Sequence, residues 1–476
     1  MVFSSLVFLS VFLVVTYLLH LVLPSVKLRN ALLVCASLVF YAYGEPVYVL
    51  CMLFSAVFNY ICAYLIGKGK PNRRAVLTVD IILNLGMLVF FKYTGFLTTQ
   101  LNAVTGLSIP VPEITLPIGI SFFTFQAMSY VIDVYRKQVD AQKNFGKVLL
   151  YISFFPQLIA GPIVKYRDIN REIDERTVTA SESALGLRRF ICGLGKKVII
   201  ANTMGQVADI IFAAPEGEIN IVTSWIGAVA YMLQIYFDFS GYSDMAIGLG
   251  RMFGFHFKEN FLYPYGSSSV KEFWRRWHIS LSSWFKDYLY IPLGGNRKGR
   301  ARACLNKIIV FFCTGLWHGA NWTFVVWGLY HGAFLLLEEY LGFLKKLPKL
   351  LMRFMTLLVV CVGFVIFRAD SISQGFFMIG NMFSGFSMSD PATSLALSQL
   401  TPWFIFVFAI AVFLAAPVKP LTEKLRSVLD NGGNAEPKGK ALALQIVLYA
   451  LSAALLCWCM LRLSGDAYNP FIYFRF

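Results

Sequence analysis

The chain is built around repeated apolar runs, each about as long as a lipid bilayer is thick. These runs include residues 2–23, 47–66, 75–97, 116–135, 191–213, 223–240 and 441–463. A helix needs about 20 apolar residues to cross the hydrocarbon layer, and only helices and closed barrels satisfy their own backbone there. Of the 476 residues 57% are hydrophobic and 14% charged, against about 25% charged in a typical soluble protein. The chain is therefore predicted to be an all-α polytopic membrane protein.

The net charge of +16 comes largely from Lys and Arg in short loops between the apolar runs, for example Lys27, Arg29 and the loop 294–302. Such loops stay on the cytoplasmic side and meet anionic lipid headgroups. This pattern predicts an N-terminus outside and, by parity, an external segment at residues 465–476. No zinc-finger spacing or RNA-recognition signature occurs, so no nucleic acid is expected as a partner.

Four segments depart from a plain span. Residues 148–163 are apolar but lie between basic loops and contain two prolines, which predicts a broken or re-entrant segment buried in protein. Residues 165–189 are the most hydrophilic stretch and favour a solvated cytoplasmic helix. Residues 273–290 mix aromatic and charged side chains, as in helices that lie along the interface or line a cavity. Residues 303–343 predict two crossings or a deep hairpin.

Two histidines stand within unusual stretches of the apolar sequence. His318 lies in Leu316–Trp322, between two strongly apolar segments, and His278 ends the aromatic and basic stretch Phe273–His278. Ionisable side chains at membrane depth are costly and usually face a cavity. A hydrogen-bonded structural histidine between helices is the alternative for either one alone. Two such stretches in one chain favour a general base and acid that work near neutral pH.

A metal site is not expected. His318 and His331 are 13 residues apart, which puts them on nearly opposite faces of one helix and roughly 20 Å apart at ~1.5 Å per residue. No H-E-x-x-H, C-x-x-C or carboxylate triad accompanies them. The absence of a G-x-S-x-G elbow and of a phosphate-binding loop argues against hydrolases of that design and against ATP use.

A second polar cluster follows one face of the span before residue 245. Its members recur about every four residues: Gln234, Asp238, Ser240 and Asp244. This spacing suits a polar face that lines a cavity. A set of hydrogen bonds between packed helices explains the same pattern equally well.

Several aromatic-rich motifs occur in a specific order along the whole chain. They are Phe40–Pro46, Pro117–Phe122, Gly161–Ile163, Asp238–Asp244, Trp274–His278, Asp287–Gly295 and Leu316–Gly319. In this order they resemble the membrane-bound O-acyltransferase (MBOAT) family, most closely its bacterial branch that modifies polysaccharides or peptidoglycan.

The resemblance implies a single membrane domain, 1–476, with about 11–12 transmembrane helices in a ring around a central tunnel. His318 matches the essential histidine of the family and His278 its second one. Further residues are expected at the substrate tunnel: Trp274, Arg275, Arg276, Trp277, Trp317, Asn321, Gln234, Asp238, Ser240 and Asp244.

The resemblance also implies the reaction and its partners. An acyl thioester, acetyl-CoA or an acyl carrier protein thioester, arrives from the cytoplasm as co-substrate, with no bound cofactor. The acyl group is passed outward across the bacterial inner membrane toward a cell-surface polysaccharide, with an extracytoplasmic SGNH-type acetyltransferase as partner. Rival interpretations are D-alanyl transfer to teichoic acid, a transporter or flippase with a His-lined passage, and a structural scaffold.

The last residues, Phe471–Phe476, resemble a C-terminal aromatic motif in which a tyrosine is thought to carry the acyl group transiently. Tyr473 is therefore a candidate acyl relay. An interfacial anchor is the alternative, because terminal aromatic residues settle at lipid headgroups.

Overall fold

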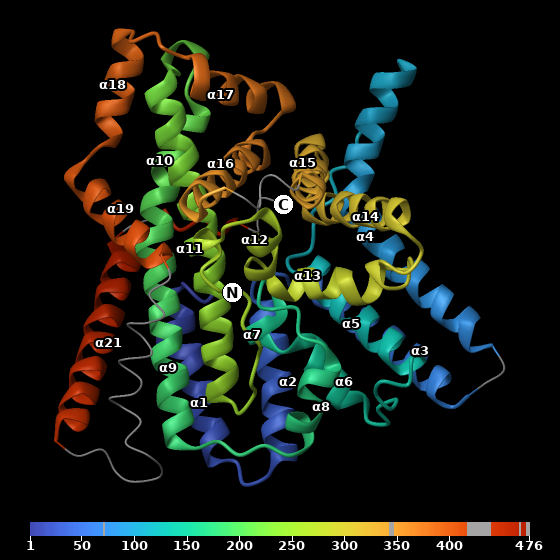
Figure 1. Cartoon of the computed structure of the whole chain (residues 1–476). Helices are drawn as coiled ribbons and strands as arrows, with labels where there is room; N and C mark the ends of the chain where they lie inside the picture. Colours follow the sequence, from blue (N-terminus) through green and yellow to red (C-terminus); the bar gives the residue numbers. More distant parts are fainter. Residues whose placement is uncertain (70–71, 342–346, 417–438, 466–467, 473–476) are drawn as a thin grey trace.

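The computed structural model describes residues 1–69, 72–341, 347–416, 439–465 and 468–472. Within these ranges every regular element is a helix, which confirms the predicted fold class (Figure 1). The first third contains η1 (Phe8–Phe12), α1 (Leu13–Val22), α2 (Val26–Ala42), α3 (Val49–Gly67), α4 (Arg73–Thr105) and α5 (Ile120–Tyr135). Helical structure in the first predicted span, 2–23, begins at Leu6, immediately before η1.

The middle third of the chain includes the long buried helix α11 (Ile221–Met252). It contains α6 (Phe145–Ser153), α7 (Phe155–Leu158), α8 (Tyr166–Asp174), α9 (Ala180–Gly195), η2 (Lys196–Ala201), α10 (Asn202–Ala213), η3 (Glu216–Glu218) and α11 (Ile221–Met252). The predicted interruption within 148–163 is present at Phe154, between α6 and α7.

The hydrophilic stretch 165–189 differs from its prediction as one solvated helix. It is divided between α8 and the beginning of α9, and α8 buries Tyr166, Ile169 and Ile173. These three apolar residues recur at helical spacing among charged neighbours, so α8 is amphipathic and packs one face against the protein.

The last part supplies η4 (Pro264–Gly266), α12 (Val270–Arg276), α13 (Ile279–Phe285), η5 (Lys286–Tyr290), α14 (Arg300–His318), α15 (Trp322–Tyr340), α16 (Lys349–Arg368), α17 (Ile372–Ser384), α18 (Asp390–Gln399), α19 (Pro402–Ala415) and α21 (Lys440–Gly465). Helices α14 and α15 pack against each other and form the hairpin predicted for 303–343.

By length and apolar composition, five described helices can each cross a membrane: α3, α4, α11, α16 and α21. The pair α18 and α19, bent by 67°, makes a sixth if it is one broken span. The expected 11–12 crossings are therefore not reached by uninterrupted apolar helices among the described residues. Several predicted spans are shorter helices or, like α9–η2–α10, helices that contain a π-helical segment.

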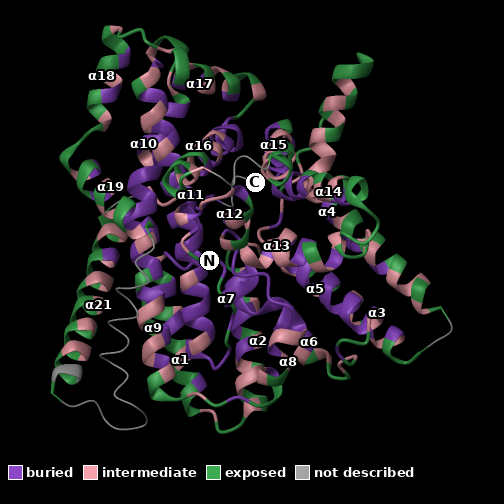
Figure 2. Ribbon diagram, in the orientation of Figure 1, coloured by how far each residue is buried: buried purple, intermediate pink, exposed green. Residues whose placement is uncertain are grey.

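Helix α11 forms the centre of the protein, and buried residues follow it along most of its length (Figure 2). Helix α9 packs closely against it. A Cβ on Gly193 would lie 2.5 Å from the carbonyl oxygen of Gly241, and one on Gly186 would lie 2.5 Å from that of Gly248. Glycines at these crossings let the two backbones approach, as small residues do between membrane helices.

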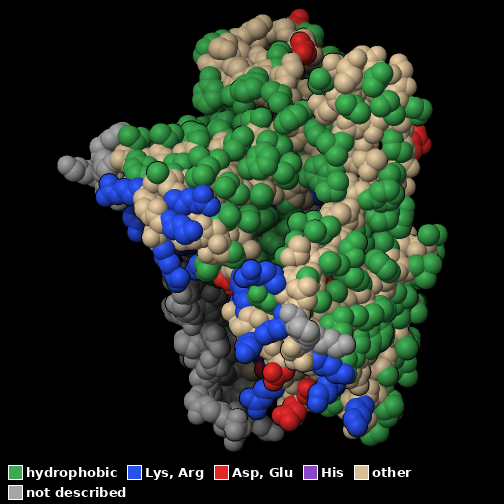
Figure 3. Space-filling model, turned by 90° about the vertical axis from the view of Figure 1, so that its right-hand side faces the viewer, with side chains coloured by type: hydrophobic (Ala, Val, Ile, Leu, Met, Phe, Trp, Pro, Cys, Tyr) green, Lys and Arg blue, Asp and Glu red, His purple; other side chains and the backbone are tan. Residues whose placement is uncertain are grey.

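Basic and acidic loops lie at opposite ends of the molecule. The beginning of α2, which carries Lys27 and Arg29, lies at the lower end of Figure 1, and the acidic η3 connection lies near the upper end. On the face in Figure 3, Lys and Arg side chains lie from mid-height downward, whereas hydrophobic side chains cover most of the upper part. The positive-inside rule predicts that the lower end faces the cytoplasm.

Candidate active site

His318 occupies the last helical position of α14, at the tip of the α14–α15 hairpin. The backbone becomes extended at Gly319, and Asn321 caps α15 by accepting a hydrogen bond from the Thr323 N–H. A Cβ on Gly319 would overlap the ring of Phe324, so only glycine fits at this position unless the neighbouring atoms shift. The break between the two helices therefore follows from the local sequence Gly319–Asn321.

The imidazole of His318 is held by three aromatic rings. Their centroids lie 5.0 Å away for Trp317, 5.1 Å for Trp327 and 5.1 Å for Phe367. Only 6% of the residue is exposed. These aromatic rings enclose the imidazole on several sides and so help to position it, as an acid or base requires.

Two neighbouring residues of α4 bind the end of α14. The Lys92 ammonium donates hydrogen bonds to the carbonyl oxygens of Trp317, at 2.6 Å, and His318, at 2.9 Å. The Tyr93 hydroxyl donates to the carbonyl oxygen of Leu316. The last carbonyls of a helix lack intrahelical partners and carry partial negative charge, so a cation there stabilises the helix end.

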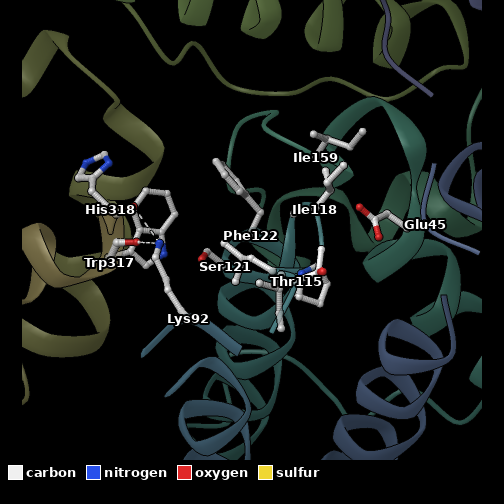
Figure 4. A pocket seen from close by; sticks show the side chains of 13 residues that line it. Glu45, Lys92, Thr115, Ile118, Ser121, Phe122, Ile159, Trp317 and His318 are labelled. Atoms are coloured by element: carbon white, nitrogen blue, oxygen red, sulfur yellow. Dashed lines mark hydrogen bonds between the residues drawn. The ribbon is translucent and has the colours of Figure 1, made fainter. Parts of the chain in front are cut away.

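His318 and Lys92 line a cavity of about 260 Å³ (Figure 4). Glu45 lies on the opposite side of this cavity, and the segment Thr115–Phe122 forms much of the wall between them. Burial raises the pKa of the Glu45 carboxyl above its usual value. His318, Lys92 and Glu45 thus border one cavity, which has room for a small acyl group and its attacking hydroxyl.

His278 lies in the turn between α12 and α13 with φ of 44°, a left-handed conformation that strains a side chain other than Gly, Asn or Asp. The buried Asn260 side chain fixes this turn by accepting hydrogen bonds from the N–H and hydroxyl of Ser280. Nε2 of His278 is buried without a hydrogen-bond partner among the described residues. The ring lies 5.9 Å from that of Trp317, so both predicted histidines contact the same tryptophan.

The predicted residues before His278 are not all brought to the cavity. Trp274 packs against Trp327, with 5.6 Å between ring centroids, and Trp277 is buried in the aromatic core. Arg276 pairs with Glu272 at 2.6 Å along one turn of α12, and Arg275 is exposed. Of the tunnel residues predicted from the resemblance, Trp317 lines the His318 cavity.

Asn321 lines a second cavity of about 250 Å³, which also includes Arg368. The Arg368 side chain is 5% exposed and pairs with Asp209 at 2.7 Å. Asp209 also accepts a hydrogen bond of 2.7 Å from the Tyr468 hydroxyl. Trp317 and His318 line the first cavity, and the next residue, Gly319, lines the second. The two cavities therefore adjoin consecutive residues of the chain.

The polar residues on α11 have other surroundings. Asp244 pairs with Arg189 and Lys196, at 2.9 and 2.6 Å. Asp238 pairs with Lys197 at 2.8 Å. Gln234 and Ser240 are buried, and none of the four predicted residues lines the His318 cavity. The two aspartates instead connect α11 to the α9–η2 helix, which corresponds to the alternative of contacts between packed helices.

Comparison with known protein sequences assigns this chain to a family. The sequence profile of the MBOAT family, membrane-bound O-acyltransferases, matches residues 136–379, which include His278 and His318. The chain is 40% identical to the probable alginate O-acetylase AlgI of Azotobacter vinelandii, over all of both chains. The chain belongs to the MBOAT family. It is therefore a multi-pass membrane O-acyltransferase.

More distant MBOAT relatives differ in their named substrates. The peptidoglycan O-acetyltransferase of Helicobacter pylori is 36% identical over 80% of each chain. The teichoic acid D-alanyltransferase of Bacillus subtilis is 27% identical over 64% of this chain and 81% of its own.

Lys92 and Glu45 were not predicted as site residues in this MBOAT chain. Lys92 is the single charged residue within the apolar run 81–112, a signal comparable to that of His318. Glu45 lies within the motif Phe40–Pro46, in a connection between spans, where a carboxylate by itself carries no special signal. Tyr473 lies outside the described residues. Among the described residues no group of three or more His, Cys, Asp or Glu side chains could hold a metal ion.

Proposed function

We propose that the chain transfers an acetyl group from a cytoplasmic thioester toward hydroxyl groups of a cell-surface polysaccharide outside the bacterial inner membrane. The observation that carries this proposal is the cavity shared by His318, Lys92 and Glu45 at the break between α14 and α15. Its outward direction is supported by the basic loops at one end of the molecule, and its substrate class by the alginate O-acetylase relative.

In the proposed reaction His318 is the general base. One imidazole nitrogen takes the proton of the attacking hydroxyl, whose oxygen forms a bond to the thioester carbonyl carbon. The carbon–sulfur bond then breaks, and the departing thiolate takes the proton from His318. His278 or Asn321 orients the thioester or donates a hydrogen bond to the developing oxyanion.

The first acceptor hydroxyl is proposed to be that of Tyr473. Its phenolic oxygen takes the acyl group, and a second hydroxyl, of an SGNH-type extracytoplasmic partner or of the polysaccharide, then attacks the tyrosyl ester. The bond between the acyl carbon and the phenolic oxygen breaks, and the phenolate takes up the proton that the second hydroxyl has lost. The donor is acetyl-CoA or an acetylated carrier protein.

D-alanyl transfer is the second candidate from the same family. The D-alanyltransferase of Bacillus subtilis is less similar and shares a smaller part of the chain than the relatives named as O-acetylase and O-acetyltransferase. These values favour acetyl transfer. Parallel assays with acetyl and D-alanyl thioesters separate the two, since the preferred donor loses its acyl group faster.

The test compares two buried histidines of one hairpin. Purified full-length protein in liposomes is given a labelled acetyl thioester, and release of the label is followed. His318→Phe should lower release by at least about 100-fold, since general base catalysis contributes about 10²–10⁴. His331→Phe is the matched control, because His331 is also buried in the hairpin but does not line the cavity. Unchanged release in His318→Phe would remove the proposed base.

Tyr473→Phe separates the relay from direct transfer. Label bound to the wild-type tail and absent from this variant supports the relay. Full transfer to the external acceptor by Tyr473→Phe would reject it while leaving His318 in place.

A further inference from the structure

The residues just before Tyr473 are inserted into the protein. Tyr468–Ile472, called here the tail segment, follows α21, and its residues Phe471 and Ile472 are only 8% and 6% exposed. The Phe471 ring lies 4.9 Å from that of Tyr242 on α11. The segment therefore packs against the central helix.

A buried ion pair holds the backbone of the tail segment. Lys197 of η2 and Asp238 of α11 lie 2.8 Å apart, and their side chains are 4% and 2% exposed. The Lys197 ammonium also donates a hydrogen bond to the Pro470 carbonyl oxygen, and Oδ2 of Asp238 accepts one of 2.9 Å from the Ile472 N–H. The cation thus binds a carbonyl group and the anion an N–H group two residues further on.

The ion pair and the tail segment depend on each other. A buried charge is tolerated only when it is paired and its remaining hydrogen-bonding positions are filled. Here two of those positions are filled by peptide groups of Pro470 and Ile472. A shift of the segment by one residue would bring different peptide groups to the pair, so this contact specifies one register.

Further polar contacts support the same register. Nδ2 of Asn202 donates to the Tyr468 carbonyl oxygen at 3.2 Å, and Nδ2 of Asn469 donates to the Ser4 carbonyl oxygen at 2.9 Å. The Tyr468 hydroxyl binds Asp209, which pairs with Arg368 at the second cavity. The segment is thereby connected to the region that adjoins His318.

We propose that Lys197 and Asp238 are positioning residues that hold the tail segment in this register and so fix the backbone immediately before Tyr473. The inference rests on the proposed role of Tyr473 as acyl carrier. The pair does not touch the acyl group in this role. It fixes the position of the backbone that leads into Tyr473, so that the phenol of Tyr473 reaches the donor in the same way each time.

The test uses full-length protein and two independent measurements. Hydrogen exchange of the peptide that contains residues 468–472 reports whether the segment is held, and label on the Tyr473 peptide reports acyl loading. The main variant is Lys197→Met/Asp238→Leu, which removes both charges together, because a single substitution would leave an unpaired buried charge and endanger folding. Lys196→Met is the matched control, since the neighbouring lysine pairs with Asp244 and makes no hydrogen bond to the tail segment.

In the double variant the tail segment should exchange at least about tenfold faster, as expected when a hydrogen bond to a charged group is lost. Acyl loading should fall by at least about tenfold, whereas the melting temperature and exchange in α11 should stay near the wild-type values. Lys196→Met should leave exchange of the segment unchanged.

Two results would overturn the inference. One is unchanged protection of the segment in the double variant, and the other is faster exchange with undiminished loading. Failure of the proposed function is distinguishable, because it would appear as loading or release that does not depend on His318 in the otherwise wild-type protein.

Discussion

Lys92→Met tests whether the end of α14 must be held for His318 to work. The substitution keeps an unbranched apolar stem but removes the donor of two hydrogen bonds, to the carbonyl oxygens of Trp317 and His318. These carbonyls end a helix, so no intrahelical N–H replaces the lost donor.

The size of the effect follows from these two bonds. A hydrogen bond from a charged donor contributes about 1.5–3 kcal/mol, so two set an upper limit of roughly 3–6 kcal/mol. Lys92 is half-buried, and its removal also removes the cost of desolvating the ammonium. We therefore expect a net loss of about 2–3 kcal/mol. If this loss falls on the positioning of His318, transfer slows by roughly 30- to 150-fold.

The assay is release of acetyl from a labelled thioester by full-length protein in liposomes, measured beside the melting temperature. Lys92→Arg keeps a cationic donor and should recover a large part of the rate, whereas Lys92→Met should not. Tyr93→Phe, which removes only the neighbouring hydroxyl, should have a smaller effect. A wild-type rate in Lys92→Met would refute the argument that the cation positions the catalytic histidine.

Three further predictions concern single sites. His278→Asn should keep the fold, because Asn tolerates the left-handed conformation of this residue, but should lower acyl release by about 100-fold or more if the ring acts on the substrate; a wild-type rate would exclude that role. Gly319→Ala should lower both the melting temperature and acyl release, with a destabilisation of about 1–3 kcal/mol, because the added methyl group overlaps the Phe324 ring. An unchanged melting temperature would contradict this close contact between Gly319 and Phe324. Burial raises the pKa of Asp287, but hydrogen bonds and charges from Lys165 and Arg167 outweigh burial and lower it below its usual value. Its contribution to stability is therefore present at neutral pH and lost as the pH falls from about 5 toward 3. Asp287→Asn should flatten that part of the plot of melting temperature against pH, and parallel plots for the two proteins would disprove the prediction.

The sequence predicted those features that depend on neighbouring residues. Apolar runs of membrane length indicated an all-α membrane protein, and the prolines near residue 160 indicated the break between α6 and α7. The basic loop before residue 303 and the apolar stretches around His318 indicated the α14–α15 hairpin. Each of these signals is local, since hydropathy and proline geometry act within about one helix.

The number of uninterrupted spans was not predictable in the same way. Hydropathy does not distinguish a helix exposed to lipid from one buried in the protein. Helix α9–η2–α10 shows the difficulty, because its apolar residues lie against α11 and its polar residues form ion pairs there. The count of expected crossings therefore exceeded the number of helices that can cross on length and composition alone.

By itself the sequence determined that this chain is a helical membrane protein and that His318 is an unusual ionisable residue within an apolar run. Only the tertiary structure decided what accompanies that histidine. Lys92 precedes His318 by 226 residues, and Glu45 lies still earlier in the chain, yet all three line one cavity. The same holds for Lys197, Asp238 and the tail segment. Hydropathy records where each residue prefers to lie, but the packing of distant helices selects the residues that meet.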